Sequence, residues 1–278
     1  MAWIPKISII MGVYNQKAFD QLETAVSSVL NQNFSDFEFL IYDDGSEKDV
    51  AVFLDELAAR DDRIRLLHGK TNRGLAHGLN VCIRNAKGAY LARMDADDVS
   101  LPERLQRQYA FLEAHPEYGF VGCNARLLRE EGIVGIRKMP EEPLAEQFLP
   151  YSPFIHPSVM FRREVFEQFG LYSESKQHLR CEDYELFMRL FQRGCRGYNI
   201  QEPLVVYRED RQAFGKRKYR YRMDEARLRY TGFRNMGLLR VQNLYWVLKP
   251  LIAGLVPGSI LYRWKKREKS YGMSAAEK

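Results

Sequence analysis

The stretch Ala89-Tyr90-Leu91-Ala92-Arg93-Met94-Asp95-Ala96-Asp97-Asp98 joins an apolar run directly to three carboxylates. Its first six residues predict a buried strand. The carboxylates that follow repel one another and favour neither helix nor strand. An isolated Asp-x-Asp-Asp is more often a solvated turn, but the apolar strand before it shifts the interpretation toward a functional site. Mg²⁺ or Mn²⁺ would relieve the repulsion, because both cations prefer oxygen ligands.

Toward the N-terminus, apolar strands followed by polar residues recur. Strands are expected at residues 6–14, 37–42 and 64–68, and helices at residues 19–30, 50–59 and 72–86. This alternation predicts an α/β domain with a largely parallel sheet. Ligands bind outside the carboxyl ends of such strands, so the polar clusters there are expected to converge on one crevice. The clusters are Tyr14-Asn15, Asp43-Asp44, Asn72-Arg73 and Asp95-Ala96-Asp97.

After residue 100 the pattern is less regular. Helices are expected at residues 102–114 and 182–192, and a last short strand at residues 203–208. Residues 118–138 look strand-like, with a turn at Gly132. Residues 139–158 are rich in proline and aromatic residues and predict a long loop, of the kind that often forms a lid or a binding loop.

The composition of the 278 residues is that of a globular protein, with 46% hydrophobic and 28% charged residues. The four cysteines form no C-x-x-C pair, which argues against a zinc site or a disulfide framework and favours a reducing compartment. The N-terminal residues carry no basic start followed by a long apolar stretch, so no secretory signal is expected.

The charge is unevenly distributed along the chain. Residues 211–278 hold 17 basic and 4 acidic residues, whereas residues 1–210 hold 25 basic and 32 acidic residues. We therefore expect an enzyme body at residues 1–210 and a basic helical appendage at residues 211–278 that contacts a polyanion. Nucleic-acid binding is disfavoured, because no recognised binding module accompanies the charge.

The appendage contains an apolar segment, residues 238–262. Lys249-Pro250 interrupts its middle, which argues against a membrane-spanning helix. Two short helices lying in an anionic membrane surface fit better, with Trp246, Tyr262 and Trp264 as anchors. The alternative is that this segment completes the core or forms an interface in a homo-oligomer.

Four motifs, in this order and spacing, resemble the inverting family 2 glycosyltransferases over about residues 5–210. They are Ser8 to Asn15, Tyr42 to Ser46, Asn72 to Gly74 and Met94 to Asp98. The resemblance implies the A-type glycosyltransferase (GT-A) fold, with helices on both faces of a nucleotide-binding sheet. A nucleotide-sugar half would cover about residues 1–100 and an acceptor half about residues 101–210.

The resemblance also implies roles for individual residues. Asp97 and Asp98 are the candidate ligands of Mn²⁺ or Mg²⁺, and the sequence leaves open which of them touches the metal. The residues that would line the nucleotide pocket are Val13, Tyr14, Asn15, Asp43, Asp44, Arg73, Asp95 and Ala96.

The resemblance further implies a carboxylate base in the run Cys181-Glu182-Asp183. Asp183 is the preferred base and Glu182 the second choice, since a helix N-terminus would stabilise an ionised Asp183. The alternative is that both acids only complement the helix dipole. His156 and Arg208 are candidate acceptor or diphosphate contacts, and an inert loop histidine and a surface arginine are equally consistent with the sequence.

The expected activity is transfer of a sugar, with inversion, from a nucleotide diphosphate sugar, a uridine one by preference, to a glycan or lipid-linked acceptor. Such a reaction serves polysaccharide or cell-surface glycan synthesis, here in the cytoplasm at the inner face of the membrane. No Gln-x-x-Arg-Trp motif follows residue 208, which disfavours processive polymer synthesis. A nucleotidyltransferase would need a glycine-rich phosphate loop, and Gly12-Val13-Tyr14-Asn15 does not supply one. A non-catalytic nucleotide-sugar or membrane-binding protein is the remaining alternative.

Overall fold

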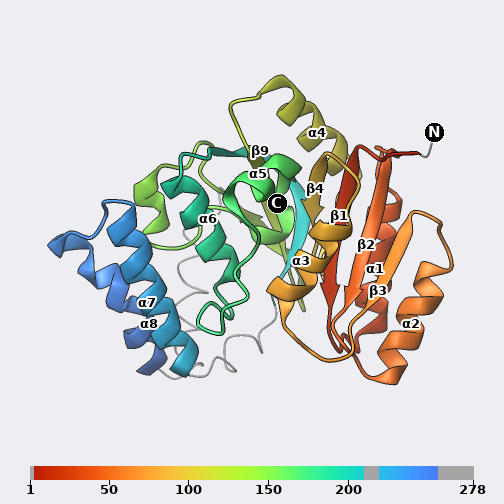
Figure 1. The fold of residues 1–278 in the computed structure, drawn as a ribbon, viewed down its shortest axis with the longest axis horizontal. Helices are drawn as coiled ribbons and strands as arrows, with labels where there is room; N and C mark the ends of the chain where they lie inside the picture. The colour runs from red at the N-terminus through yellow and green to blue at the C-terminus, as the bar shows by residue number, and fades with distance from the viewer. Residues whose placement is uncertain (1–2, 210–218, 256–278) are drawn as a thin grey trace.

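The computed structural model describes residues 3–209 and 219–255. These residues form one sheet in the order β3-β2-β1-β4-β8-β6-β9-β5, with β7 beside β6 (Figure 1). The strands are β1 Ile7–Val13, β2 Phe37–Asp43, β3 Ile64–His68, β4 Tyr90–Arg93, β5 Val99–Ser100, β6 Phe120–Arg129, β7 Gly132–Arg137, β8 Met160–Arg162 and β9 Gly197–Arg208. The helices are α1 Phe19–Leu30, α2 Lys48–Ala58, α3 Leu75–Asn85, α4 Arg104–Ala114, α5 Arg163–Phe169, α6 Glu182–Gln192, α7 Tyr219–Asn235 and α8 Leu244–Leu255, with short 3-10 turns at Ala145–Phe148, His156–Ser158 and Val241–Asn243.

The first four strands are parallel, as the sequence predicted for this part of the chain. Alternate residues of β1 point to opposite faces of the sheet. Ile9 and Met11 pack in one core with residues of α1, α2 and α4. Ile10 packs in the other, with residues of α3, α5 and α6. Helices therefore cover both faces, and the carboxyl ends of β1, β2 and β4 lie at the same edge.

The second half of the sheet is mixed, so the expectation of a largely parallel sheet holds only as far as β4. Strand β8 is antiparallel to both β4 and β6, whereas β9 runs parallel to β6. The sequence pattern predicted neither β8 nor α5, and it predicted β9 only from residue 203. A three-residue strand is too short to show a period, and Asn199, Gln201 and Glu202 interrupt the first part of β9 with polar side chains.

The short connection from β4 to β5 joins the two halves. Residues 94–98 lead from β4 in the middle of the sheet to β5, which pairs with β9 at its far edge. At one end of this connection, Met94 donates its N–H to the Ile10 carbonyl at 3.1 Å. At the other end, the Arg208 N–H donates to Asp98 Oδ1 at 2.8 Å. Five residues span at most about 18 Å, so the end of β9 is held close to the end of β1.

Helices α7 and α8, in the basic segment, pack beside α6 (Figure 1). Leu228 and Phe233 of α7 and Val247 of α8 share a core with Phe187 of α6. In addition, Arg229 donates to the Leu149 carbonyl at 2.7 Å. Among the described residues, none of the helices combines the length and the apolar character needed to cross a bilayer. The anchors expected at Tyr262 and Trp264 lie outside the described residues.

A buried ionic network closes the amino end of the sheet. Glu38 of β2 accepts hydrogen bonds from the Ser8 hydroxyl at 2.7 Å and from Arg65 at 2.5 Å. The Lys87 N–H also donates to Glu38, at 2.5 Å. Burial alone would raise the pKa of Glu38, but these donors outweigh it and hold the pKa below its ordinary value of 4.5.

We expect Glu38→Gln to destabilise the protein by about 1–3 kcal/mol near neutral pH, since it removes charge-assisted hydrogen bonds from buried donors. The pKa of Glu38 is lower in the folded than in the unfolded chain. Its ionisation therefore stabilises the fold above pH 4.5 and loses this effect as the pH falls through the folded pKa. Urea unfolding at a series of pH values should show that the difference in the free energy of unfolding between the wild type and Glu38→Gln becomes smaller in acid. The exposed Glu56→Gln is the control, and a pH-independent difference at Glu38 would contradict the assignment.

Candidate active site

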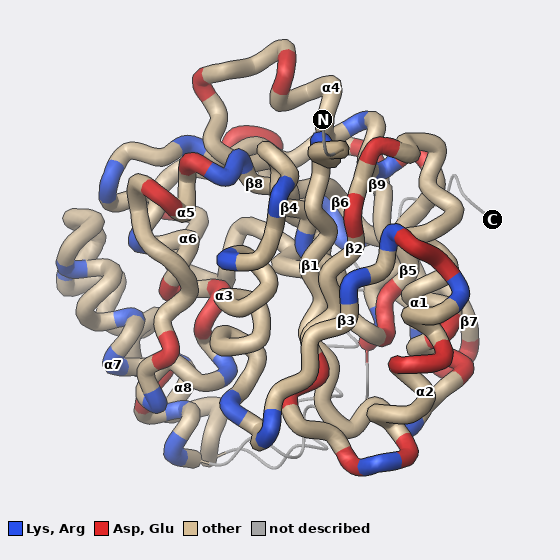
Figure 2. The backbone as a smooth tube through the Cα atoms, turned by 45° about the vertical axis from the view of Figure 1, so that its right-hand side comes forward, with Lys and Arg blue, Asp and Glu red and all other residues tan. Residues whose placement is uncertain are grey.

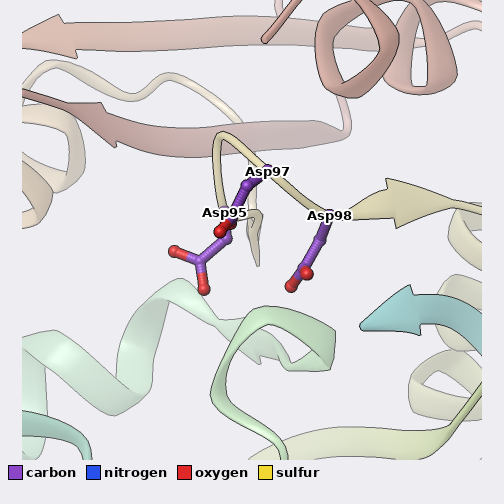
Figure 3. Close-up of side chains that lie close together, drawn as sticks. All are labelled: Asp95, Asp97 and Asp98. Carbon is purple, nitrogen blue, oxygen red and sulfur yellow. The ribbon is translucent and has the colours of Figure 1, made fainter. Parts of the chain in front are cut away.

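The acidic run forms the turn between β4 and β5, and its three side chains point to the same side of this turn (Figure 3). Asp95, Asp97 and Asp98 each offer an oxygen within 4.8 Å of the others. Burial, together with the charge of Asp95, raises the pKa of Asp97 to about 6. The same causes raise the pKa of Asp98 well above its ordinary value. The cluster therefore holds more negative charge than its surroundings neutralise.

The carboxylates fit a divalent cation. Asp98 Oδ2 is buried and has no hydrogen-bond partner, while Oδ1 is held by the Arg208 N–H. A hard cation would supply the missing partner and reduce the repulsion. Asp97 is more accessible than Asp98, and their oxygens are close enough together for both residues to contribute ligands to one cation.

Two buried arginines underlie the acidic turn. Arg93 is 2% exposed, and its Nη2 lies 2.5 Å from Asp95 Oδ1. Its Nε and Nη1 have no hydrogen-bond partner. Arg104, at the start of α4, donates to the Arg93 carbonyl at 2.7 Å, and burial lowers the pKa of Arg104 to about 10. Neither arginine was singled out by the sequence pattern, because Arg93 lies within an apolar run that predicts a strand. A charged residue inside such an apolar run is the signal that could have identified Arg93.

The loops after β1 and β2 hold one another. Asn15 adopts φ 47°, and its side-chain oxygen accepts the Glu47 N–H at 2.8 Å. Asp43 accepts the Ser46 N–H at 2.9 Å and lies 3.0 Å from His68 Nδ1. Asp43 and its neighbour Asp44 are both buried, so their first effect is to fix the conformation of these loops.

Asp44 organises the start of α3. Its two oxygens accept the N–H groups of Arg73 and Gly74 at 2.9 and 2.7 Å. Gly74 has φ 94°, a conformation that glycine adopts without strain. The Arg73 side chain is exposed and reaches toward Glu174, 3.4 Å away. Of the residues expected at the nucleotide, Tyr14 is exposed, Val13 is buried at the end of β1, and Ala96 lies in the acidic turn.

A cavity of about 420 Å³ lies between the acidic turn and the first turn of α6. Asp95, His156, Glu182 and Asp183 line it, so the structure brings together these four of the predicted residues. Three basic side chains line the same cavity, namely Arg137, Lys138 and Arg180. The remaining lining residues are Met139, Tyr151, Ser152, Phe154, Ile155, Pro157 and Tyr207. Most of them belong to the long loop predicted at residues 139–158. The sequence predicted a lid or binding loop there, but it did not indicate which loop residues would line the cavity.

The two acids at the start of α6 have different surroundings. Burial, followed by the neighbouring charge of Asp183, raises the pKa of Glu182. Glu182 Oε2 is buried without a hydrogen-bond partner. Both residues lie in the first helical turn, where the helix dipole favours an anion. Burial thus favours the protonated form of Glu182.

His156 is a neutral group in this cavity. Its Nε2 lies 2.8 Å from the Tyr172 hydroxyl. Burial, with a contribution from the charge of Arg93, holds the pKa of His156 well below 6.5. The imidazole can therefore hydrogen-bond to a hydroxyl but does not present a positive charge to a diphosphate at neutral pH.

Arg208 lies at the end of β9, beside the acidic turn and outside the cavity lining. Its N–H binds Asp98, and its Nε donates to the Asp97 carbonyl at 3.1 Å. These bonds fix the turn against β9. The diphosphate contact expected of the Arg208 guanidinium stays a prediction.

The family model described as Glycosyl transferase family 2 matches residues 8–170. The chain is 37% identical over 264 residues to "Putative glycosyltransferase EpsE" of Bacillus subtilis, covering 95% of this chain and 94% of that protein. It is 31% identical over 207 residues to "O-antigen biosynthesis glycosyltransferase WbnJ" of Escherichia coli, covering 73% and 79%.

Solved structures agree on the fold. S. aureus TarS 1-349 in complex with UDP-GlcNAc aligns with TM-score 0.62 and 15% identity, covering 88% of this chain and 79% of that one. The mannosyltransferase PcManGT from Pyrobaculum calidifontis, in complex with GDP-Man and Mn²⁺, aligns with TM-score 0.59 and 19% identity, covering 98% and 82%. These neighbours are GT-A fold glycosyltransferases, which confirms the predicted fold class. With a family model matched over more than half of its length and a relative of this identity and coverage, the chain belongs to glycosyltransferase family 2 and is a glycosyltransferase.

Proposed function

We propose that the protein transfers a sugar from a uridine diphosphate sugar to a hydroxyl of a glycan or lipid-linked acceptor, with inversion and with the help of Mn²⁺ or Mg²⁺. The observation that carries this proposal is the cavity that Asp95 of the acidic turn shares with Asp183 of α6. In this cavity the leaving diphosphate would lie at the acidic turn and the acceptor hydroxyl would lie near Asp183. Single displacement at the anomeric carbon needs both.

Asp183 is proposed as the general base. The acceptor hydroxyl must lose its proton as it attacks, and an ionised carboxylate within reach can take that proton. Glu182 suits this role less, because burial and the adjacent Asp183 raise the pKa of Glu182. The neutral His156 would orient a hydroxyl of the acceptor or of the donor sugar.

Asp95, Asp97 and Asp98 are proposed to hold the donor diphosphate through the cation, with Asp97 as the principal ligand. When bound, the cation would neutralise the charge that develops on the leaving diphosphate. Asp44 and Asn15 would act by shaping the loops that receive the nucleotide, since their side chains bind backbone N–H groups. The exposed Tyr14 and Arg73 would contact the nucleotide directly.

The bound UDP-GlcNAc in one structural neighbour supports the uridine donor, and the O-antigen relative supports a role in polysaccharide synthesis. Mn²⁺ in the other neighbour supports the cation. That neighbour binds GDP-Man, so screening nucleotide sugars for turnover is the direct test of the donor.

Replacing the proposed base should abolish most turnover. We expect Asp183→Asn to lower kcat by about 10²–10⁴-fold, because positioned proton transfer contributes this much. Binding of the nucleotide diphosphate should change little, since the residue faces the acceptor. The matched control is Glu185→Gln in the same helical turn, which pairs with Arg189 at 2.7 Å. Equal turnover of Asp183→Asn and the wild type would show that the base lies elsewhere.

The cation proposal predicts a measurable coupling. Mn²⁺ or Mg²⁺ should tighten binding of uridine diphosphate, measured by calorimetry against the same titration with chelator. Asp97→Asn should lose most of this gain, whereas Asp62→Asn, an exposed residue elsewhere, should keep it. Metal-independent binding in the wild type would refute the assignment of the acidic turn.

A further inference from the structure

Helix α8 exposes a continuous apolar stripe. Leu244, Tyr245, Leu248, Ile252 and Leu255 follow the spacing of one helical face. Each is between 41% and 76% exposed. The opposite face carries the buried Val247 and Pro250 and packs on the rest of the protein. A helix that buries one face and still presents five large apolar side chains to solvent is unusual for a monomeric protein.

Helix α7 adds a second stripe beside the first. Tyr219, Met223 and Tyr230 are exposed, and their spacing again places them on one face. The two helices meet where Gly254 of α8 lies against the ring of Tyr219; a Cβ added at Gly254 would lie 2.9 Å from that ring. The exposed apolar residues of α7 and α8 therefore belong to one surface, which we call the hairpin face.

The charges around the hairpin face are basic. Residues 219–255 contain seven basic and two acidic residues. Both acids, Asp224 and Glu225, are buried, and they pair with Arg227 at 3.3 Å and with Arg229 at 3.1 Å. Residues 236–255 contain no acidic residue at all. The surface is thus left with cations, seen as the blue segments on α7 and α8 (Figure 2).

An apolar stripe flanked by cations, with its own carboxylates buried, matches the chemistry of an anionic bilayer surface. Apolar side chains would enter the boundary between headgroups and acyl chains, and the arginines would meet lipid phosphates. A second copy of this chain fits less well, because two hairpin faces would bring like charges together. No membrane-spanning helix is needed for such binding.

We propose that the hairpin face docks the protein on an anionic lipid bilayer, with Leu248 and Ile252 at its centre. The inference extends the proposed function, because a lipid-linked acceptor would be met at that surface. It stands on the exposed residues of α7 and α8 alone, and none of them lines the cavity.

The test is flotation of the full-length protein with phosphatidylcholine vesicles that contain or lack phosphatidylglycerol. The wild type should float only with the anionic vesicles, and the double variant Leu248→Glu/Ile252→Glu should bind at least about tenfold more weakly, since both apolar burial and charge attraction are lost. The control Val52→Glu/Ile133→Glu places the same two changes at exposed apolar residues of α2 and β7 and should bind like the wild type.

A second variant guards against misfolding of α8. Arg234→Glu/Arg240→Glu leaves the apolar stripe intact, and it should also weaken binding to anionic vesicles. Equal binding to neutral and anionic vesicles, or unchanged binding of either variant, would overturn the proposal. Sedimentation that shows a wild-type dimer converted to a monomer by Leu248→Glu/Ile252→Glu would assign the face to a second copy instead.

Donor hydrolysis in vesicle-free solution separates this inference from the proposed function. The Leu248→Glu/Ile252→Glu variant should retain the wild-type rate, because the cavity is unaltered. A wild type without any turnover would count against the proposed function and leave the flotation result standing.

Discussion

The buried guanidinium of Arg93 is the constraint around which the site is organised. A buried charge is costly unless it is paired, and Arg93 Nη2 forms an ion pair with Asp95 Oδ1 at 2.5 Å. This pairing directs Asp95 back toward β4 while Asp97 and Asp98 complete the turn. Arg104 of α4 fixes the Arg93 backbone by donating a hydrogen bond of 2.7 Å to the Arg93 carbonyl. Two buried arginines thus hold Asp95, while Arg208 holds the Asp97 and Asp98 end of the turn.

The acidic turn is short, and it links the two parts of the sheet. Residues 94–98 begin at the end of β4, beside β1, and end at β5, where the Arg208 N–H of β9 binds Asp98. The parallel and the mixed part of the sheet therefore cannot separate at this edge without breaking that hydrogen bond. The carboxyl end of β9 also carries Tyr207, which lines the cavity. One loop therefore fixes both the candidate metal ligands and the strand that forms one wall of the cavity.

Local patterns predicted the elements up to β4 within a few residues, because each strand there is mostly apolar and each helix has a clear apolar face. The later helices α4 and α6 were predicted as well, but β8 and the first part of β9 depend on contacts that no local pattern records. Strand β8 is three residues long, and the first part of β9 is polar. At the site, the motif residues were recognised by chemical type, but the hydrogen bonds from the Arg73 and Gly74 N–H groups to Asp44 emerge only from the fold. Arg137 and Lys138 reach the cavity from one segment and Arg180 from another, and the two segments share no sequence pattern.

The distribution of charge in the cavity argues for a cation on physical grounds. Asp95, Glu182 and Asp183 line the cavity, and Asp97 and Asp98 stand beside it. A diphosphate brought to this edge would meet this negative charge, in a place where burial, followed by the charge of Asp95, already raises the pKa of Asp97 to about 6. The neutral His156 cannot offset that repulsion. Lys138 and Arg137 also line the cavity and can attract an anion into it, but the carboxylates would still oppose its approach to the acidic turn. Asp97 and Asp98 would hold a divalent cation here, and its charge would offset this repulsion and satisfy Asp98 Oδ2, which lacks a hydrogen-bond partner.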